Sequence, residues 1–348
     1  MESQNHFYGH SAALARYVGR NRPRHVRGLI QHGWTALSPV ATHFRDFPHL
    51  GLEDGDSRLL VWSHTSRAWD PAAERHHTTP IAAPFVYLAA ASGPLPQPRD
   101  ERDEVVLMPV HGIQTQRVRG DHAGLAKLWR EQEGEATVCL YAADAEDPEI
   151  AGAYAAAGHR LVVLGDRMDP AFLWRLWTMV GRARRVVSNR LSTPVVYAAH
   201  LGVDVGVYGD ALRIDGEGVA DNDRVRELWP ELHGATIDPA TAKALSDAEL
   251  GVAHLRPPHE LEDLLGWNRA PVGSAVSYWS TSPARRAVVN LRRRAGSPSP
   301  SPSEAAPSSL SFAAWFRAAM SYLPQRLPRE IPRAGETREP VPVSAAGL

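Results

Sequence analysis

Apolar runs alternate with segments of helical character between about residues 104 and 210. The helical segments span 120–132, 147–157, 170–184 and 193–201, and some carry a capping residue or a first-turn proline. The runs between them are apolar throughout, which is typical of parallel strands covered on both faces. They read "EVVLMPV", "ATVCLYAA", "RLVVLG", "RRVVS" and "VDVGVYG". This order predicts a doubly wound α/β domain.

The first hundred residues repeat this alternation more weakly. Candidate strands read "VRGLIQH", "RLLVWS" and "IAAPFVYLA", and candidate helices lie near 11–19 and 66–77. The stretch "PLPQPRDERDE" is rich in proline and charge and predicts a linker. We therefore expect an α/β fold of two facing Rossmann-like domains, an N-terminal one at 1–98 and a C-terminal one at 104–290.

The pattern changes after the second domain. Closing helices are predicted at "HELEDLLGW" and "SPARRAVVNLRRR", a disordered Pro/Ser linker at 295–309 and a disordered tail at 328–348. Between the last two, residues 310–327 predict an amphipathic helix with one apolar stripe. The stripe consists of Phe312, Trp315, Phe316, Ala319, Met320 and Leu323. Such a helix either lies on a membrane surface or packs on its own domain or a partner.

Composition restricts the class of protein. With 348 residues and 43% hydrophobic content the chain is long enough for two cores, and its net charge of -1 gives no basic field for nucleic acid. The single cysteine, Cys139, excludes an intrachain disulfide and suits a reducing compartment. No apolar run reaches the length of a signal peptide core or a spanning helix. We therefore expect a cytoplasmic protein.

Four polar residues lie between the end of the predicted strand "RRVVS" and the start of the next predicted helix, which has a proline in its first turn. They are Ser188, Asn189, Ser192 and Thr193. A helix N-terminus offers free N–H groups and a partial positive charge, and hydroxyl groups add hydrogen-bond donors. The group predicts a metal-free phosphate pocket. The alternative is simple capping with polar filler, because one such residue is enough to cap a helix.

Two histidines are expected to face each other across the cleft between the domains. His111 and Gly112 follow the first strand of the second domain, and His32 follows the first strand of the first domain. Ligands bind at the carboxyl ends of parallel strands. His111 is therefore placed to donate to a phosphate or to protonate a departing one, and His32 to contact an acceptor or serve as the base. Arg117 and Arg119 lie in the same stretch and could supply fixed cations near His111.

The sequence also offers two acidic residues as candidate bases and lacks several common enzyme motifs. Glu53 and Asp54 precede a glycine and are candidate bases, with a solvated loop as the alternative. Neither half has a GxGxxG turn, a phosphate loop or a Gly-x-Ser-x-Gly elbow, which argues against a dinucleotide oxidoreductase, an ordinary ATPase and a hydrolase. His76 and His77 lack further ligands at metal-binding spacing, so no metal site is predicted.

With these residues placed, the chain resembles the two-domain glycosyltransferases of the GT-B fold, in particular bacterial enzymes of capsule and surface-polysaccharide assembly. The likeness is carried by "LMPVHG", "VVSNRLSTPVVYAAHLGVDVGVYG" and "IAAPFVYLA". Sialyltransferases of this fold have an acidic pair before Gly, a His-Pro and a Ser-Ser or Ser-Thr, in that order. This sequence is similar, with Gly112 at the proline position; the matching residues are Glu53-Asp54-Gly55, His111 and Ser192-Thr193. "QHGW" resembles the His-Gly of CDP-glycerol glycerophosphotransferases.

The resemblance implies a metal-independent, inverting transfer from a nucleotide-activated donor, linked to CMP, CDP or UDP, to a glycan hydroxyl. The second domain would hold the donor and the first the acceptor, with no cofactor and no nucleic acid. We expect His32, Glu53 or Asp54 as the base, and residues 310–327 as a contact with the inner face of the membrane or with an assembly complex. Two alternatives stay open: a nucleotide-sugar epimerase, and a non-catalytic sugar-nucleotide-binding or scaffold protein.

Overall fold

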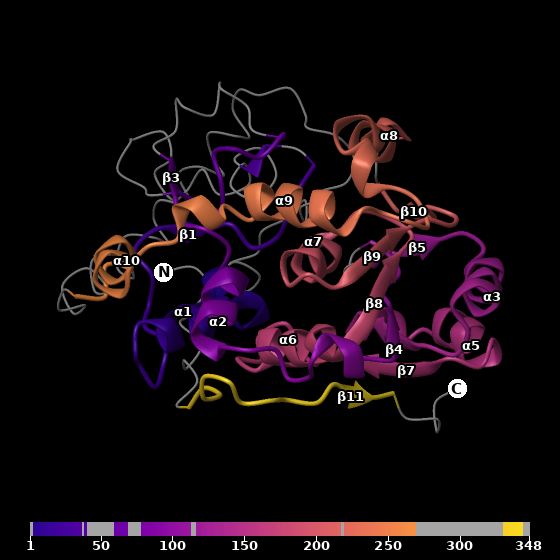
Figure 1. Ribbon diagram of the computed structural model, residues 1–348, viewed down its shortest axis with the longest axis horizontal. Coiled ribbons are helices and arrows are strands. Elements are labelled where there is room, and N and C mark those ends of the chain that lie inside the picture. The colour runs from indigo at the N-terminus through magenta and orange to yellow at the C-terminus, as the bar shows by residue number, and fades with distance from the viewer. Residues whose placement is uncertain are drawn as a thin grey trace, which may run out of the picture.

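The computed structural model describes residues 3–36, 38–39, 59–68, 78–112, 116–216, 219–268 and 330–343. Its larger sheet has six strands in the order β11-β7-β6-β4-β8-β9, all parallel except β11 (Figure 1). The strands are β4 (Glu104–Leu107), β6 (Thr137–Leu140), β7 (Arg160–Val163), β8 (Ala183–Ser188), β9 (Asp204–Val207) and β11 (Val341–Pro342). The five strands predicted for this domain are confirmed.

Helices cover both faces of this sheet. Val105 and Leu107 of β4 pack into one apolar cluster with α3 (His122–Glu133) and α5 (Pro148–Ala156). Val106, the residue between them, packs into a second cluster with α6 (Phe172–Arg182) and α7 (Thr193–His200). Successive side chains of a strand point to opposite faces, so a strand buried on both sides is apolar at every position. This confirms the doubly wound α/β prediction.

A smaller parallel sheet lies in the first third of the chain. Its strand order is β1-β2-β3, with β1 (Leu29–Ile30), β2 (Leu59–Val61) and β3 (Thr78–Pro80). Ahead of it come the 3-10 segment η1 (Ser3–Gly9) and α1 (His10–Tyr17), which confirms the helix expected at 11–19. The helix expected at 66–77 lies mostly outside the described residues. The predicted fold class, α/β with parallel sheets in two units, is confirmed.

One prediction for the first unit is wrong. The run "IAAPFVYLA" forms α2 (Pro84–Ser92) and not a strand. Pro84 has a fixed φ that suits the first helical turn, and it begins the helix. The side chains from Pro84 to Leu88 are all buried, so no polar face marks the helical period in the sequence. The strand of this region is instead the short β3 just before it.

After the strands of the second unit, the chain returns to the first unit. Helices α9 (Pro239–Glu249) and α10 (Pro258–Leu265) follow the second unit along the chain, and α9 packs on α7. The N–H groups of Ala83 and Arg27 donate to the carbonyls of Leu250 and Leu265, each at 2.9 Å. Residues 239–265, which the sequence assigns to the domain at 104–290, therefore contact both units. One apolar cluster contains Leu60 of β2 and Val186 of β8, so the two units share a core.

Several short elements connect these parts. The strands β5 (Val118–Arg119) and β10 (Arg213–Ile214) pair antiparallel at the edge of the second unit. The remaining helices are α4 (Ala142–Ala145) and α8 (Val219–Leu228), and the remaining 3-10 segments are η6 (Arg99–Glu101), η7 (Pro230–Leu232) and η8 (Val252–His254). Within the described ranges, no helix is long and apolar enough to cross a bilayer.

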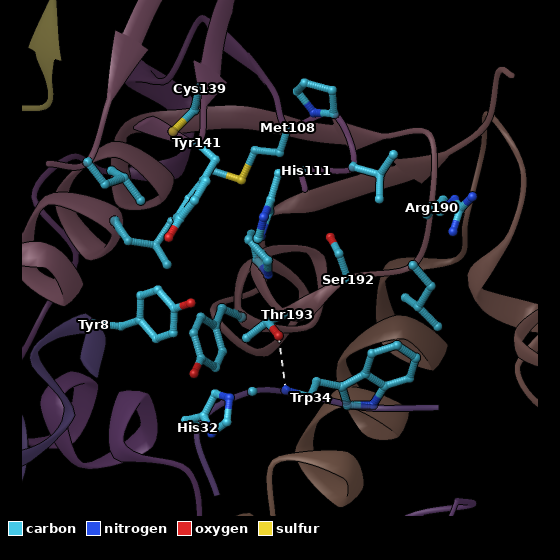
Figure 2. Close-up of a pocket in the computed structure, with 18 of the residues that line it drawn as sticks. Tyr8, His32, Trp34, Met108, His111, Cys139, Tyr141, Arg190, Ser192 and Thr193 are labelled. Carbon is cyan, nitrogen blue, oxygen red and sulfur yellow. Dashed lines mark hydrogen bonds between the residues drawn. The ribbon is translucent and has the colours of Figure 1, made fainter. Parts of the chain in front are cut away.

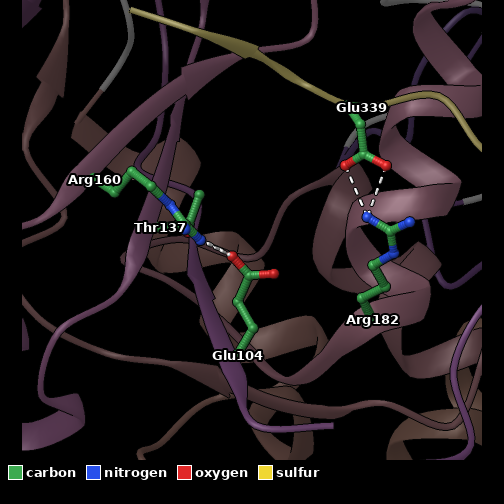
Figure 3. A network of polar contacts seen from close by, with 5 residues as sticks. All are labelled: Glu104, Thr137, Arg160, Arg182 and Glu339. Atoms are coloured by element: carbon green, nitrogen blue, oxygen red, sulfur yellow. Dashed lines mark hydrogen bonds and ion pairs between the residues drawn. The ribbon is translucent and has the colours of Figure 1, made fainter.

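Residues 330–343, which fall within the tail predicted to be disordered at 328–348, contact both units. This segment runs along α6 and ends in β11, which pairs with the edge strand β7 (Figure 1). Figure 3 shows Glu339 of this segment on Arg182 of α6, with both carboxylate oxygens 2.7 Å from Nη1. The same view shows Thr137 donating to Glu104 at 2.6 Å, which joins β6 to β4. The linker 295–309 and the helix 310–327 lie outside the described residues.

Candidate functional site

A cavity of about 540 Å³ lies between the two units (Figure 2). Its wall in the second unit comes from the carboxyl ends of β4, β6 and β7 and from the start of α7. Its wall in the first unit comes from Tyr8, His10 and residues 32–36, which follow β1. From β4 the sheet grows in one direction through β6 and β7 and in the opposite direction through β8 and β9. The cavity lies at the carboxyl ends of the strands, at this reversal of strand order, which is where ligands bind in such sheets. Its volume suits a small-molecule ligand.

Ser192 and Thr193 line this cavity, as predicted for a ligand-contacting pair. Ser192 is the N-cap of α7, but its hydroxyl makes no capping bond and has no hydrogen-bond partner among the described residues. Figure 2 shows that hydroxyl pointing into the cavity toward His111. The first bond of the helix runs from Val196 N to Ser192 O (3.1 Å), so the N–H groups of Thr193 and Val195 precede the ladder. This end of the cavity can therefore donate hydrogen bonds to an anion.

Ser188 and Asn189 do not line the cavity. Their side chains are at most 1% exposed. Asn189 accepts a bond from Val110 N (2.7 Å) and donates to Asp210 O (2.8 Å), which ties the loops after β4 and β9 together. Ser188 accepts a bond from Arg190 N (3.3 Å). These two side chains therefore hold the loops together, and the predicted contact with phosphate is wrong for them.

His111 lies exposed at the mouth of the cavity. Its ring stacks on Tyr141 with centroids 4.8 Å apart, and its Nδ1 is 2.8 Å from Gly112 O. Because a carbonyl only accepts, Nδ1 carries a proton, which leaves Nε2 as the atom for a ligand. A Cβ on Gly112 would lie 2.0 Å from Gln116 O, so the turn that presents His111 requires glycine.

The two arginines predicted beside His111 point elsewhere. Arg117 pairs with Asp147 (3.8 Å) and Arg119 with Asp215 (3.3 Å), and both side chains are exposed outside the cavity. The cavity is lined instead by Arg190, whose guanidinium donates to the carbonyls of Ala211 and Leu212. It is the one lysine or arginine among the described lining residues.

The opposite end of the cavity is aromatic and uncharged. Burial lowers the pKa of His32 to about 4, with a smaller contribution from Arg167, and burial lowers the pKa of His10 to about 3. Burial also raises the pKa of Tyr8 to about 12. His32 lines the cavity, where the sequence predicted it to lie. Because of its lowered pKa, its imidazole is neutral at neutral pH.

Sequence reasoning missed Tyr8, His10, Tyr141 and Trp34. Tyr8 and His10 come from η1 and the start of α1, and both line the cavity opposite Tyr141 of the second unit. Positive φ values at Tyr8 and Gly9 turn this segment toward the second unit, where a Cβ on Gly9 would lie 2.7 Å from Pro170 O. The signal that was available was the "YGH" turn before a helix.

A buried carboxylate holds the first-unit wall in place. Glu249 is 3% exposed and accepts from the indole N–H groups of Trp34 (3.0 Å) and Trp229 (2.9 Å). It also accepts from the hydroxyl of Ser66 (2.6 Å) and the N–H of Arg67 (3.0 Å). The predicted bases Glu53 and Asp54 lie outside the described residues. Over the part of the chain that the structure describes, no group of three or more potential ligands forms a metal site.

Comparisons with known proteins give little further guidance. No family model and no curated protein matches the chain. Among solved structures it is similar to MurG of Acinetobacter baumannii, with 12% identity and a TM-score of 0.33 over 72% of this chain and 68% of that one. It is also similar to a glycosyltransferase of kitacinnamycin, with 17% identity and a TM-score of 0.27 over 65% of this chain and 58% of that one. Both likenesses are too distant to carry an argument.

Proposed function

We propose that this protein transfers a sugar or polyol phosphate from a nucleotide-activated donor to an acceptor hydroxyl, without a metal and with inversion. One observation carries the proposal: the cavity opens at the switch point of one parallel sheet and faces the end of β1 in another, with a helix N-terminus on one wall. The donor and the acceptor would enter this cavity from opposite sides.

The donor phosphates would rest against the start of α7. The Ser192 hydroxyl and the leading N–H groups of the helix supply hydrogen bonds and a partial positive charge there, and Nε2 of His111 faces the same ligand. In the reaction a bond forms between the acceptor oxygen and the transferred carbon or phosphorus. The bond to the donor's leaving phosphate breaks, and its electron pair stays on that phosphate. Preorganised donors at α7 would stabilise this charge without a metal.

His32 is our choice of base from the residues that line the cavity, with Glu53 and Asp54 as the other candidates. A base with a pKa of about 4 is weak at neutral pH, but it is fully deprotonated before the reaction. The negative charge of a bound donor raises the pKa of a nearby histidine, because opposite charges favour the protonated form. Donor binding would therefore make His32 a stronger base when the acceptor is in place.

Thermal unfolding with CMP, CDP, UDP, GDP, ADP and dTDP, each with and without EDTA, tests the donor site. A ligand that binds only the folded state stabilises it by ~2.7 kcal/mol at a hundredfold excess over its dissociation constant. We expect one nucleotide to raise the midpoint with no effect of EDTA, and Ser192→Ala to reduce that shift. If every nucleotide leaves the midpoint unchanged, the proposal is wrong.

Binding without turnover would identify a non-catalytic sugar-nucleotide-binding protein instead. The observation that favours this second function is the scarcity of cations: Arg190 is the one arginine or lysine on the described lining, and backbone carbonyls already occupy it. Mass spectrometry of the matching nucleotide sugar, incubated with and without acceptors, separates the two functions. Release of free nucleotide only in the presence of an acceptor supports transfer.

The cellular setting is also part of the proposal. We propose that the reaction belongs to cell-surface polysaccharide synthesis at the cytoplasmic face of the membrane, with residues 310–327 as the contact; the resemblance to capsule enzymes supports this. Sedimentation with anionic vesicles tests this, using the full chain and a chain that lacks 310–327. Equal sedimentation of both would contradict the membrane contact.

A further inference from the structure

Arg167 places a positive charge beside the cavity without lining it. It belongs to the loop that joins β7 to α6, and Leu164 and Gly165 of the same loop line the cavity. The carbonyl of Arg167 accepts from the N–H of Tyr8 (2.5 Å). Its guanidinium lies over the ring of Phe7, with 4.5 Å from Cζ to the ring centroid. A loop of the second unit therefore holds this cation against the first unit, next to a residue that lines the cavity.

Three side chains at one end of the cavity respond to this charge. They are Tyr8, His32 and Tyr141, which we call the inner end, and Figure 2 shows them on the side of the cavity away from Arg190. Burial is the largest cause of each pKa shift: it lowers the pKa of His32 to about 4, raises that of Tyr8 to about 12 and raises that of Tyr141. Arg167 lowers the pKa of all three. For an imidazole and a phenol alike, this direction means a positive potential.

Nearby acids cancel this potential only in part. No carboxylate in the described ranges lies within ion-pair distance of Arg167. Asp166 and Asp144 oppose its effect at Tyr141, and each of them acts more weakly there than Arg167 does. At the other two side chains of the inner end, no carboxylate in those ranges opposes it. The inner end therefore has uncharged walls and a positive potential.

We propose that Arg167 makes the inner end select a ligand that carries an anionic group, either a carboxylate or a phosphate. The proposal rests on the proposed function only in naming this ligand as the acceptor, which is then an acidic sugar or polyol. A buried anion needs a positive potential and hydrogen-bond donors in place of its lost hydration. Arg167 supplies the potential. Burial keeps the phenol groups of Tyr8 and Tyr141 protonated at neutral pH, so their hydroxyls can donate.

An anion at the inner end also acts on the proposed base. Burial and, less strongly, Arg167 lower the pKa of His32. A negative charge beside the imidazole offsets the effect of Arg167 and raises the pKa again. An acidic acceptor would thus make His32 a stronger base as it binds, whereas a neutral acceptor leaves the effect of Arg167 in place.

Binding titrations of the full chain with three matched probes, in the absence of nucleotide, test the proposal. Phenyl β-D-glucoside is neutral, and its 6-phosphate and the corresponding glucuronide carry the two anionic groups at the same carbon. Ligand-observed NMR follows all three. We expect at least one anion to bind about three- to tenfold more tightly than the glucoside at low salt, the range for one unit charge at short distance. Added salt should reduce this preference, and the tighter anion tells a carboxylate site from a phosphate site.

Variants at Arg167 assign the preference. Arg167→Gln removes the charge and should abolish the preference for anions, while unchanged binding of the glucoside shows that the variant is folded. Arg167→Lys keeps the charge and should keep most of the preference. Arg184→Gln is the matched control, because Arg184 is exposed at the amino end of β8, at the edge of the sheet away from the cavity. Anion binding at the start of α7 would instead weaken in Ser192→Ala and persist in Arg167→Gln.

The outcomes separate this inference from the proposed function. The inference is overturned if the three probes bind equally, if none of them binds, or if the preference for an anion survives Arg167→Gln. A nucleotide that raises the unfolding midpoint would still support the donor site in those cases. Conversely, a preference that Arg167→Gln abolishes, with no response to any nucleotide, would keep the inference and remove the transferase.

Discussion

The backbone N–H of Trp34 donates to the hydroxyl of Thr193 across the cavity (2.9 Å). Trp34 belongs to the loop after β1, and Thr193 is the first residue of α7. This bond joins the two units at the place where a donor phosphate is proposed to sit. Of the two predicted hydroxyls that line the cavity, the one on Thr193 therefore fixes the shape of the cavity, and the one on Ser192 faces it.

The two hydroxyls should respond differently to removal. Thr193→Val keeps the shape of the side chain but leaves the Trp34 N–H without its acceptor, which costs about 1 kcal/mol. In a protein of this size that lowers the melting temperature by roughly 1–2 °C. Ser192→Ala should leave the melting temperature unchanged, because its hydroxyl has no partner in the described structure. Differential scanning calorimetry makes the comparison, and equal losses in both variants would contradict these roles.

Replacing Glu249 should weaken the first-unit wall more strongly. Each carboxylate oxygen accepts two hydrogen bonds, and an amide turns one of these oxygens into an NH2 group that faces donors. We expect Glu249→Gln to lower the free energy of unfolding by about 2–3 kcal/mol in urea titrations. Glu231→Gln is the control: its carboxylate is 42% exposed, and its pairing with Arg67 is worth less than about 1 kcal/mol. Equal losses would mean that Glu249 is not the anchor.

The free energy of unfolding should fall as the pH drops below about 6.5, the ordinary pKa of histidine. Burial lowers the pKa of His6 and His10 to about 3 and of His32 to about 4, against about 6.5 in the unfolded chain. Between these values the unfolded chain binds more protons, so the free energy of unfolding rises with pH and levels off above about 6.5. Each histidine contributes up to about 1.4 kcal/mol per pH unit in that window.

The variant His10→Leu checks this origin. Leucine does not titrate, so the dependence of the unfolding free energy on pH between about 6.5 and 5 should become shallower by one histidine's share. Urea titrations at several pH values measure the slope for the variant and the parent. Identical slopes would show that His10 takes no part, whatever the absolute stability of the variant.

The sequence predicted the second unit better than the first. Val105, Val106 and Leu107 of β4 are all apolar because helices cover both faces of the sheet, and that pattern is local. The helix at Pro84 was mistaken for a strand because its first five residues are all buried, so no polar face marks its period there. Nothing local marks β11 either, since Val341 and Pro342 are exposed and pair only with an edge strand.

The candidate site shows the same division. Ser192, Thr193, His111 and His32 were found because they follow strands or begin helices, and those positions are readable from the chain. Tyr8 and His10 precede the first strand and reach the cavity through tertiary contacts, among them the bond from Tyr8 N to Arg167 O and the packing of Tyr8 on Phe172. Ser188 and Asn189 occupy the right position in sequence, but their side chains turn into the protein, which the sequence does not specify.

The segment 330–343 should stabilise the protein through its buried beginning and not through its exposed ion pair. Arg16 of α1 donates to the carbonyls of Pro332 (2.8 Å) and Ile331 (2.9 Å), so this contact joins the segment to the first unit. Arg182 pairs with Glu339, whose carboxylate is 63% exposed. Arg16→Met leaves two carbonyls without donors and should cost about 2 kcal/mol, whereas Arg182→Met should cost less than about 1 kcal/mol. Urea unfolding of the two variants makes the comparison, because both changes remove a guanidinium and keep an apolar stem. A larger loss in Arg182→Met would mean that the segment is held mainly by its ion pair.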